Sequence, residues 1–489
     1  MQTDPVQTRS PWADPTRLLT AGLALGVILA VTACSGGPAR HPSAASSGPA
    51  ATPASTGTRA ASAGTEATNW LQYHGNAART GNVAGLPAAG RLSVTWSRNL
   101  GAAVYGQPLV IGSTVIAATE SDEVYALDRS TGAVRWHRRI GTPLPLADQP
   151  CGDINPLGIT STPVYDPQTG LVYVVGQDGR TGHVLAGLTL SGQIRVRVSL
   201  PAFDHEPAYD QQRGALALGN GHVYVVFGGH DGDCGPYVGT VEAVPVSGVG
   251  RIFGYLVPTA KQGGIWAAGG PVIGPGGTVY VSTGNGAPGA ARYDGSDSVT
   301  ALSPALKETG IFAPTDWRML SNDDLDLGSM SPALLSDGQI LQVGKSGTGY
   351  LLNAAHLGGV GGQVADAPVC TAIGGALGGG GAFGGAAVSN DIVYVPCVTG
   401  LAAVDTASDR VSVRWRGPAN VWGSPVVGGG AVWVASPYTG VLYELAPATG
   451  RVRQHLAVAS QLPHFVSPSL SGRLVLIGTM TGVVAVSGA

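Results

Sequence analysis

The chain has 489 residues, including 76 glycines and 34 prolines, with 12% charged residues and a formal net charge of −3. Glycine and proline are unfavourable inside helices, so long helices are not expected. The chain has no strongly basic field and only one long apolar run, so composition and charge exclude a nucleic-acid partner and a polytopic membrane protein.

The first 34 residues predict an export signal. An apolar run of roughly 16 residues follows Arg17, which is short for a spanning helix and typical of a signal peptide. The run ends in Val31-Thr32-Ala33-Cys34, which resembles the lipobox of bacterial lipoproteins. We therefore expect a lipoprotein signal peptide over residues 1–34, with Cys34 lipidated and the protein held on the outer face of the cell membrane. An ordinary secretory signal and an uncleaved anchor are the alternatives.

Residues 35–68 are almost entirely serine, alanine, glycine, proline and threonine. Such a segment cannot bury enough apolar surface to offset its chain entropy, so it predicts a disordered tether. The folded domain is then expected over residues 69–489. The partners expected from this organisation are the membrane, through the lipid anchor, and an unknown small ligand or protein, and the domain is expected to be a monomer.

Four cysteines remain after Cys34, namely Cys151, Cys234, Cys370 and Cys397. An even number in an exported chain predicts two disulfides, for which three connectivities exist. We favour Cys151–Cys234 and Cys370–Cys397, the second because it closes the shorter loop. No Cys-x-x-Cys spacing occurs, which argues against a zinc site or a c-type haem.

From about residue 92 the chain repeats one pattern of short strands and turns. Each unit opens with a proline or small residue, at Gln107-Pro108, Thr162-Pro163, Gly214-Ala215, Gly270-Pro271, Ser331-Pro332, Gly385-Ala386, Ser424-Pro425 and Ser467-Pro468. A second strand of the Val-Tyr-Val type follows in most units. Eight such units predict an all-β, eight-bladed β-propeller with four-stranded antiparallel blades. The last unit holds only about three strands, so we expect the strand Leu92–Ser97 to complete it and close the ring.

The clearest unit runs from Val124 to Trp136. In it, Asp128 can accept hydrogen bonds from turn amides and Gly132 can take a positive φ. Trp136 then offers a large ring to cover the neighbouring blade. Its Tyr-Ala-Leu-Asp-x-x-Thr-Gly-x-x-x-Trp pattern resembles the repeat of pyrroloquinoline quinone (PQQ) propellers, the quinoprotein alcohol dehydrogenase-like superfamily. The segment Trp70–Gly81 also resembles the segment that opens such domains.

The resemblance implies positions for a quinone site. Trp266, in Gly263-Gly264-Ile265-Trp266, matches the tryptophan that stacks on the quinone, and Asn285 matches a Ca²⁺ ligand. Asp326 matches the catalytic base, and Lys345 matches a residue that contacts the quinone. These roles apply only if the protein is an enzyme.

Two positions depart from the family pattern. The family stacks the quinone on a disulfide of adjacent cysteines, but Gly152 follows Cys151 where the second cysteine would stand. Asp233 or Cys234 falls where the family has a Glu ligand of Ca²⁺. The resemblance thus implies that Cys151 and Cys234 pair across the former quinone pocket. Asp233 could still serve a metal ion beside Asn285.

Loops that precede the opening strands should gather at one mouth of the central channel. They contribute Tyr105, Gln212, Arg213, Trp266, Asp326, Phe383, Trp422 and His464. Aromatic rings with one arginine, one acid and one histidine could form a binding pocket. The alternative is a plugged channel whose polar groups are all satisfied.

These observations favour a lipid-anchored, extracytoplasmic propeller that acts as a ligand- or protein-binding scaffold, with a degenerate quinone site and no cofactor. The alternative is a dehydrogenase that uses PQQ and Ca²⁺ to oxidise an alcohol or a sugar. A propeller that binds or cleaves sugars is a third hypothesis.

Overall fold

The computed structural model describes residues 69–179, 182–201, 203, 207–371 and 380–488. The expected signal peptide, the tether and Cys34 lie outside the described residues. Residues Ala67–Ala489 form one compact unit. Within the part of the chain that the structure describes, no helix has the length and apolar character needed to cross a membrane.

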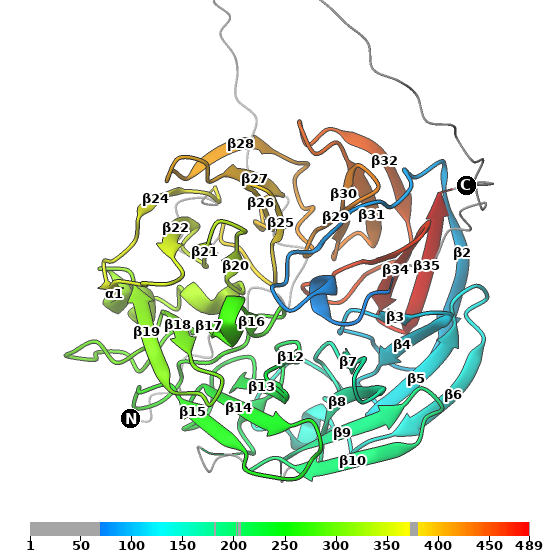
Figure 1. Cartoon of the computed structure of the whole chain (residues 1–489), viewed down its shortest axis with the longest axis horizontal. Coiled ribbons are helices and arrows are strands. Elements are labelled where there is room, and N and C mark those ends of the chain that lie inside the picture. The colour runs from blue at the N-terminus through cyan, green and yellow to red at the C-terminus, as the bar shows by residue number, and fades with distance from the viewer. Residues whose placement is uncertain (1–68, 180–181, 202, 204–206, 372–379, 489) are drawn as a thin grey trace, which may run out of the picture. The chain divides into compact units, whose positions relative to one another are not determined.

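Eight sheets form the blades of a ring, as predicted (Figure 1). Blade 1 consists of β3 (Leu109–Ile111), β4 (Thr114–Ala118), β5 (Glu123–Asp128) and β6 (Val134–Arg139). Blade 2 consists of β7 (Val164–Asp166), β8 (Leu171–Gln177), β9 (His183–Thr189) and β10 (Ile194–Ser199). Blade 3 consists of β12 (Ala217–Gly219), β13 (His222–Gly229), β14 (Thr240–Pro245) and β15 (Phe253–Leu256). Blade 4 consists of β16 (Val272–Ile273), β17 (Val279–Ser282), β18 (Val299–Leu302) and β19 (Glu308–Ala313).

The second half of the ring follows the same order. Blade 5 consists of β20 (Ala333–Leu334), β21 (Gln339–Val343), β22 (Thr348–Asn353) and β24 (Ala365–Pro368). Blade 6 consists of β25 (Ala387–Ser389), β26 (Ile392–Val395), β27 (Ala402–Asp405) and β28 (Ser412–Arg416). Blade 7 consists of β29 (Val426–Gly428), β30 (Ala431–Ser436), β31 (Val441–Leu445) and β32 (Val452–Ala457). Blade 8 contains β33 (Ser469–Ser471), β34 (Leu474–Thr479) and β35 (Gly482–Gly488).

The fourth strand of blade 8 comes from the start of the domain. Strand β2 (Leu92–Asn99) pairs antiparallel with β35, from Leu92 opposite Gly488 to Asn99 opposite Gly482. The predicted closure of the ring by an N-terminal strand is therefore confirmed. Because this pairing joins the two ends of the folded chain, it leaves no gap between the first and last blades (Figure 1).

Three blades carry one strand beyond the predicted four. Strands β1 (Asn82–Val83), β11 (Asp210–Gln211) and β23 (Gly359–Val360) add to blades 7, 3 and 4 respectively. The α-helix α1 (Trp317–Asn322) has 6 residues and lies between blades 4 and 5 in the chain. The fold class is all-β, as the glycine and proline content indicates.

Neighbouring blades pack through the tryptophan that ends the repeat. The ring of Trp136 lies against Gly192 of the next blade, and its Nε1 donates to the carbonyl of Leu190 at 2.8 Å. Trp96 lies in the same way over Gly132, where an added Cβ would stand 2.5 Å from the ring. Gly132 has φ +66°, so the position requires glycine for its backbone as well as for space. These contacts give the glycine and the tryptophan of the repeat a shared role at the junction between blades.

The segment Trp70–Val83, which we call the hub segment, crosses the centre of the ring (Figure 1, blue). It hydrogen-bonds to the innermost strand, or to the residue leading into it, of seven blades. Its partners are Val110, Tyr165, Leu216, Ile273, Val388, Val427 and Ser467, for blades 1 to 4 and 6 to 8 in order. One short segment thus ties seven of the eight blades together along the axis.

Candidate binding site at the channel mouth

Aromatic side chains from four blade junctions converge at one mouth of the channel. Phe383 and Phe465 stack with ring centroids 5.7 Å apart and planes 4° apart. Trp266 lies 6.2 Å from Phe383 and 6.1 Å from Phe465, and Trp422 lies 6.4 Å from Phe383. Tyr438 extends the cluster beyond Trp422. Phe383 and Trp422 are buried, whereas Trp266, Phe465 and Tyr438 are half-buried, so the cluster offers three partly accessible rings.

Arg213 is packed between two of the mouth rings. Its guanidinium carbon lies 5.5 Å from the centroid of Tyr105 and 5.2 Å from that of Phe465. One guanidinium nitrogen donates to the carbonyl of His464 at 3.1 Å. Phe465 has φ +61°, an uncommon conformation for a bulky residue, and it aims the ring at the arginine.

Gln212 points into the channel wall and donates to the carbonyl of Gly214 at 2.7 Å. The structure therefore brings together the eight side chains that the sequence predicts for the mouth, with Gln212 in a wall position. Tyr105 is half-buried, and burial, Glu120 and Asp153 raise the pKa of its hydroxyl well above its usual value. Whether these residues bind a ligand remains a prediction.

Lys345 forms an ion-pair cluster with two aspartates at the mouth. Its Nζ contacts Asp326 and lies 2.7 Å from Asp324. Burial alone would lower the pKa of Lys345, but Asp326 and Asp324 raise it above its usual value, so the ammonium stays charged. The same Nζ lies 5.6 Å from the ring centroid of Trp266. Asp326 also accepts a hydrogen bond from the backbone amide of Asn285 at 2.6 Å.

Asp233 supplies a further carboxylate beside this cluster. The hydroxyl of Tyr237 donates to it at 2.5 Å. Burial raises the pKa of Asp233, and the negative charge of Asp326 raises it further. Asp233, Asn285 and Asp326 would offer oxygen donors, the type that Ca²⁺ prefers. Among the described residues, however, no group of three His, Cys, Asp or Glu side chains is arranged to hold a metal ion.

The structure forms the two disulfides favoured from the sequence. Cys151 pairs with Cys234, with Cα atoms 6.2 Å apart, and Cys370 pairs with Cys397, with Cα atoms 5.4 Å apart. The first joins the loop between β6 and β7 to the loop between β13 and β14.

Several mouth residues were not foreseen from the sequence. Glu120, between β4 and β5, is buried, and it accepts hydrogen bonds from the amide of Gly158 at 2.7 Å and the hydroxyl of Thr160 at 3.1 Å. Phe465 and Tyr438 were missed as well, although Phe465 directly follows the predicted His464. A position shortly before an opening strand could have identified Phe465, whereas Tyr438 lies between β30 and β31, where no sequence signal marks it.

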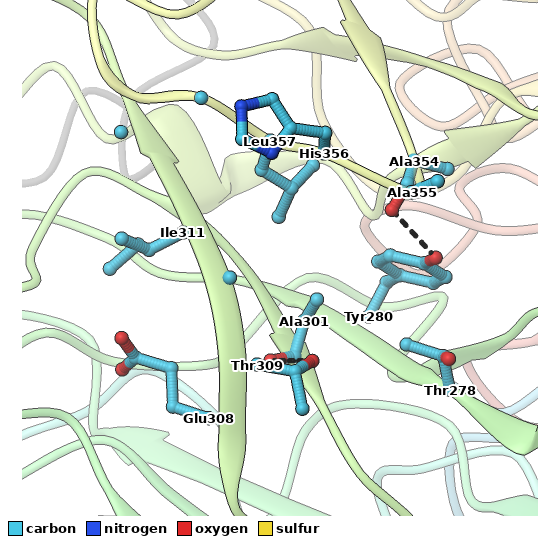
Figure 2. Close-up of a pocket in the computed structure, with 13 residues that line it drawn as sticks. Thr278, Tyr280, Ala301, Glu308, Thr309, Ile311, Ala354, Ala355, His356 and Leu357 are labelled. Atoms are coloured by element: carbon cyan, nitrogen blue, oxygen red, sulfur yellow. Dashed lines mark hydrogen bonds between the residues drawn. The ribbon is translucent and has the colours of Figure 1, made fainter.

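A separate hollow of about 520 Å³ lies in blade 4 and the turn that follows β22. Figure 2 shows Glu308 and Ile311 on one side, with His356 and Leu357 on another and Tyr280 beside Ala354. The hydroxyl of Tyr280 donates to the carbonyl of Ala354 at 2.9 Å. None of the predicted mouth residues lines this hollow.

Comparisons with known proteins agree with the fold and the repeat. A family model described as "Outer membrane protein assembly factor BamB" matches residues 78–232. Quinohemoprotein alcohol dehydrogenase ADHIIG from Pseudomonas putida HK5 superposes with a TM-score of 0.64 at 16% identity, covering 86% of this chain and 80% of that one. A europium-containing methanol dehydrogenase gives 0.63 at 18% identity, covering 85% and 90%.

The described domain is a PQQ-like β-propeller. A curated relative, a polyvinylalcohol dehydrogenase from Pseudomonas sp., is 25% identical over 247 residues, which is 45% of this chain. The match covers 36% of that relative's length, so its activity cannot be transferred directly. At these identities the solved structures establish the fold of the propeller and not its chemistry.

Proposed function

We propose that this PQQ-like propeller is an exported binding protein that takes a small ligand at its channel mouth. The observation that carries the proposal is the convergence of Trp266, Phe383, Trp422, Tyr438 and Phe465 beside buried charges. Clefts that combine aromatic walls with a few polar groups are the usual form of small-molecule sites. Export and attachment through Cys34 belong to the same proposal, supported by the lipobox-like sequence and by the family description that names an outer-membrane assembly factor. A protein partner is the other occupant such a scaffold could have.

Two features favour binding over turnover. Asp326, the expected base, is already paired with Lys345 and accepts a hydrogen bond from the backbone amide of Asn285, so its carboxylate is engaged by two groups of the protein itself. Gly152 stands where a vicinal disulfide would need its second cysteine, and Cys151 is bonded to a distant loop instead. The tryptophan that would stack on one face of a quinone is present as Trp266. The disulfide of adjacent cysteines that would cover the other face is absent, because Gly152 follows Cys151.

A quinone-dependent dehydrogenase is the second candidate. It is favoured by the proximity of Trp266, Lys345 and Asp326, and by the relative named as a polyvinylalcohol dehydrogenase. Asp233, Asn285 and Asp326 have the donor chemistry to hold Ca²⁺, but the quinone itself is matched on one face only. PQQ would supply the acceptor for two electrons taken from an alcohol. Because the fit to the quinone is incomplete, no catalytic step is derived for this chain.

One experiment separates the two functions. Purified protein is titrated with PQQ and Ca²⁺ while tryptophan fluorescence is followed, and dye reduction is then assayed with alcohols, sugars and polyvinyl alcohol. The binding function predicts no turnover, together with saturable quenching by other small ligands that is lost in Trp266→Ala. The dehydrogenase function predicts turnover that disappears in Asp326→Asn but persists in the control Asp128→Asn in blade 1. That result would contradict the proposal of a binding protein.

A further inference from the structure

We propose that the ligand of the mouth carries a carboxylate, and that Arg213 binds this group in the channel neck. The channel neck is the part of the channel between the mouth rings and the hub segment, bordered by Tyr73, Gln212, Arg213 and Ser331. The inference rests on the proposed binding function and adds the chemical class of the ligand.

Arg213 is a buried charge without a counter-ion in contact. Its residue surface is 8% exposed. Among the described residues it makes one hydrogen bond, to the carbonyl of His464, and no carboxylate lies within 4.0 Å of its nitrogens. A guanidinium carries five N–H donors in a fixed plane, which matches the two oxygens of a carboxylate. A buried charge is normally paired, so an anion at this position would complete the site.

The neck also holds buried polar atoms without partners. The side-chain oxygens of Ser331 and Gln212 are buried and accept or donate no hydrogen bond within the described part of the chain. The buried hydroxyl of Tyr73 lies beside the hydroxyls of Ser424 and Ser467. Tyr73 and Ser331 both border Gly269, so they line the same space. Buried polar atoms are nearly always hydrogen-bonded in proteins, which indicates that the neck accommodates a polar group or water.

A second buried arginine borders the neck. The guanidinium of Arg79, in the hub segment, lies 5.9 Å from the ring of Tyr73, and the residue is 3% exposed. Its guanidinium donates to the carbonyls of Pro271, Tyr73 and Leu216 and forms no ion pair among the described residues. Glu120 and Asp153 act on Arg213 from beyond ion-pair distance, so a contacting anion would still complete its pairing.

The rim restricts the ligand further. Asp153, Asp231 and Asp324 are exposed at the mouth, so a ligand with several negative charges would be repelled there. A single carboxylate can pass to Arg213 while the body of the ligand contacts Phe465 and Trp266, both half-buried aromatic rings. The site therefore suits a small monocarboxylate with a flat or aromatic body.

The test compares three probes of one shape and different charge on the full chain: benzoate, neutral benzamide and cationic benzylamine. Binding is measured by calorimetry and by tryptophan fluorescence. We expect saturable binding of benzoate, with benzamide and benzylamine about tenfold weaker or more, because charge-assisted hydrogen bonds contribute that much. Arg213→Gln should weaken benzoate about tenfold or more and leave benzamide unchanged, while Arg213→Lys keeps part of the difference.

Arg135→Gln, which removes an arginine from a surface pair with Asp128, is the matched control and should bind benzoate as the unaltered protein does. If Arg213→Gln does not fold, the comparison of benzoate, benzamide and benzylamine on the unaltered protein still tests the inference. Benzamide or benzylamine binding as tightly as benzoate would overturn the inference, as would the absence of benzoate binding. If neutral ligands quench Trp266 while benzoate does not bind, the binding function stands and the carboxylate specificity fails.

Discussion

Glu120 carries the clearest pH-sensitive charge beside the channel mouth. Its side chain is 2% exposed, and burial raises its pKa from 4.5 to about 7, against the opposing effect of hydrogen bonds from Gly158 and Thr160. The native protein therefore holds a proton on this carboxyl at pH values where the unfolded chain has released it. Stability from this group is complete below about pH 4.5 and falls as the pH rises to about 7.

Glu120→Gln should remove this dependence. Between pH 5 and 8 the unaltered protein should lose about 3 kcal/mol of unfolding free energy through Glu120, whereas the variant should show a flatter profile. Urea unfolding across this pH range measures the difference. Asp128→Asn, at an exposed turn, serves as the control for a carboxylate whose pKa is lowered. A variant with the same slope as the unaltered protein would show that Glu120 does not titrate in this range.

At the scale of elements, the Cys151–Cys234 disulfide joins two loops that border the mouth. It closes 83 residues of chain, while Cys370–Cys397 closes 27. A cross-link restricts the unfolded chain more when the closed loop is longer. The first disulfide therefore contributes more to stability in addition to holding the mouth loops together.

Replacing both cysteines of a pair by alanine tests this difference. Cys151→Ala/Cys234→Ala should lower the unfolding free energy by about 4.5 kcal/mol, and Cys370→Ala/Cys397→Ala by about 3.5 kcal/mol. Chemical denaturation of the two double variants gives both values. The mouth double variant should also bind its ligand more weakly, whereas the other should not. An equal loss of ligand binding in both would mean that the effect is one of overall stability.

At the scale of the whole molecule, the ring is held by two N-terminal segments with different roles. Strand β2 closes blade 8, and the hub segment hydrogen-bonds to seven of the eight blades along the axis. Trp70 is fully buried in the hub segment, and its Nε1 donates to Gln107 at 3.0 Å. Its loss would leave a cavity near the centre of the ring and remove one of the two hydrogen bonds that the amide oxygen of Gln107 accepts, the other coming from the backbone N–H of His74.

Trp70→Ala should therefore destabilise the propeller by about 3–5 kcal/mol. The matched control is Trp136→Ala at a blade junction, where the ring is only half-buried and the expected loss is smaller, about 1–2 kcal/mol. Thermal unfolding followed by circular dichroism compares the two. Equal losses would show that the hub position is no more important than any junction between blades.

The architecture was readable from the sequence because each blade is a local unit. Opening prolines or small residues followed by short β-rich strands recur in eight units, with the Asp128-to-Trp136 pattern clearest in blade 1, and each signal depends on residues close together in the chain. The incomplete last unit and the unassigned Leu92–Ser97 strand also sufficed to predict closure. The extra strands β1, β11 and β23 were missed because they have two residues each and pair only through neighbours supplied by the fold.

Only part of the channel mouth could be predicted from the sequence. The rule that loops before opening strands gather at one end located Trp266, Arg213 and Phe383, but it could not assign their contacts. The packing of Arg213 between Tyr105 and Phe465 joins residues more than 100 positions apart, and so does the hub segment with blade 8. Local sequence patterns do not indicate which residues that are far apart in the chain will be in contact.

The sequence by itself determined the number of blades, the strand that closes them and the residues that bring neighbouring blades together, since these follow from turn chemistry and strand periodicity. Only the tertiary structure decided which side chains meet on the axis. Closing the ring places Arg213, Lys345 and the aromatic rings of separate blades around one channel, and burial there leaves the guanidinium of Arg213 without an ion-pair partner among the described residues.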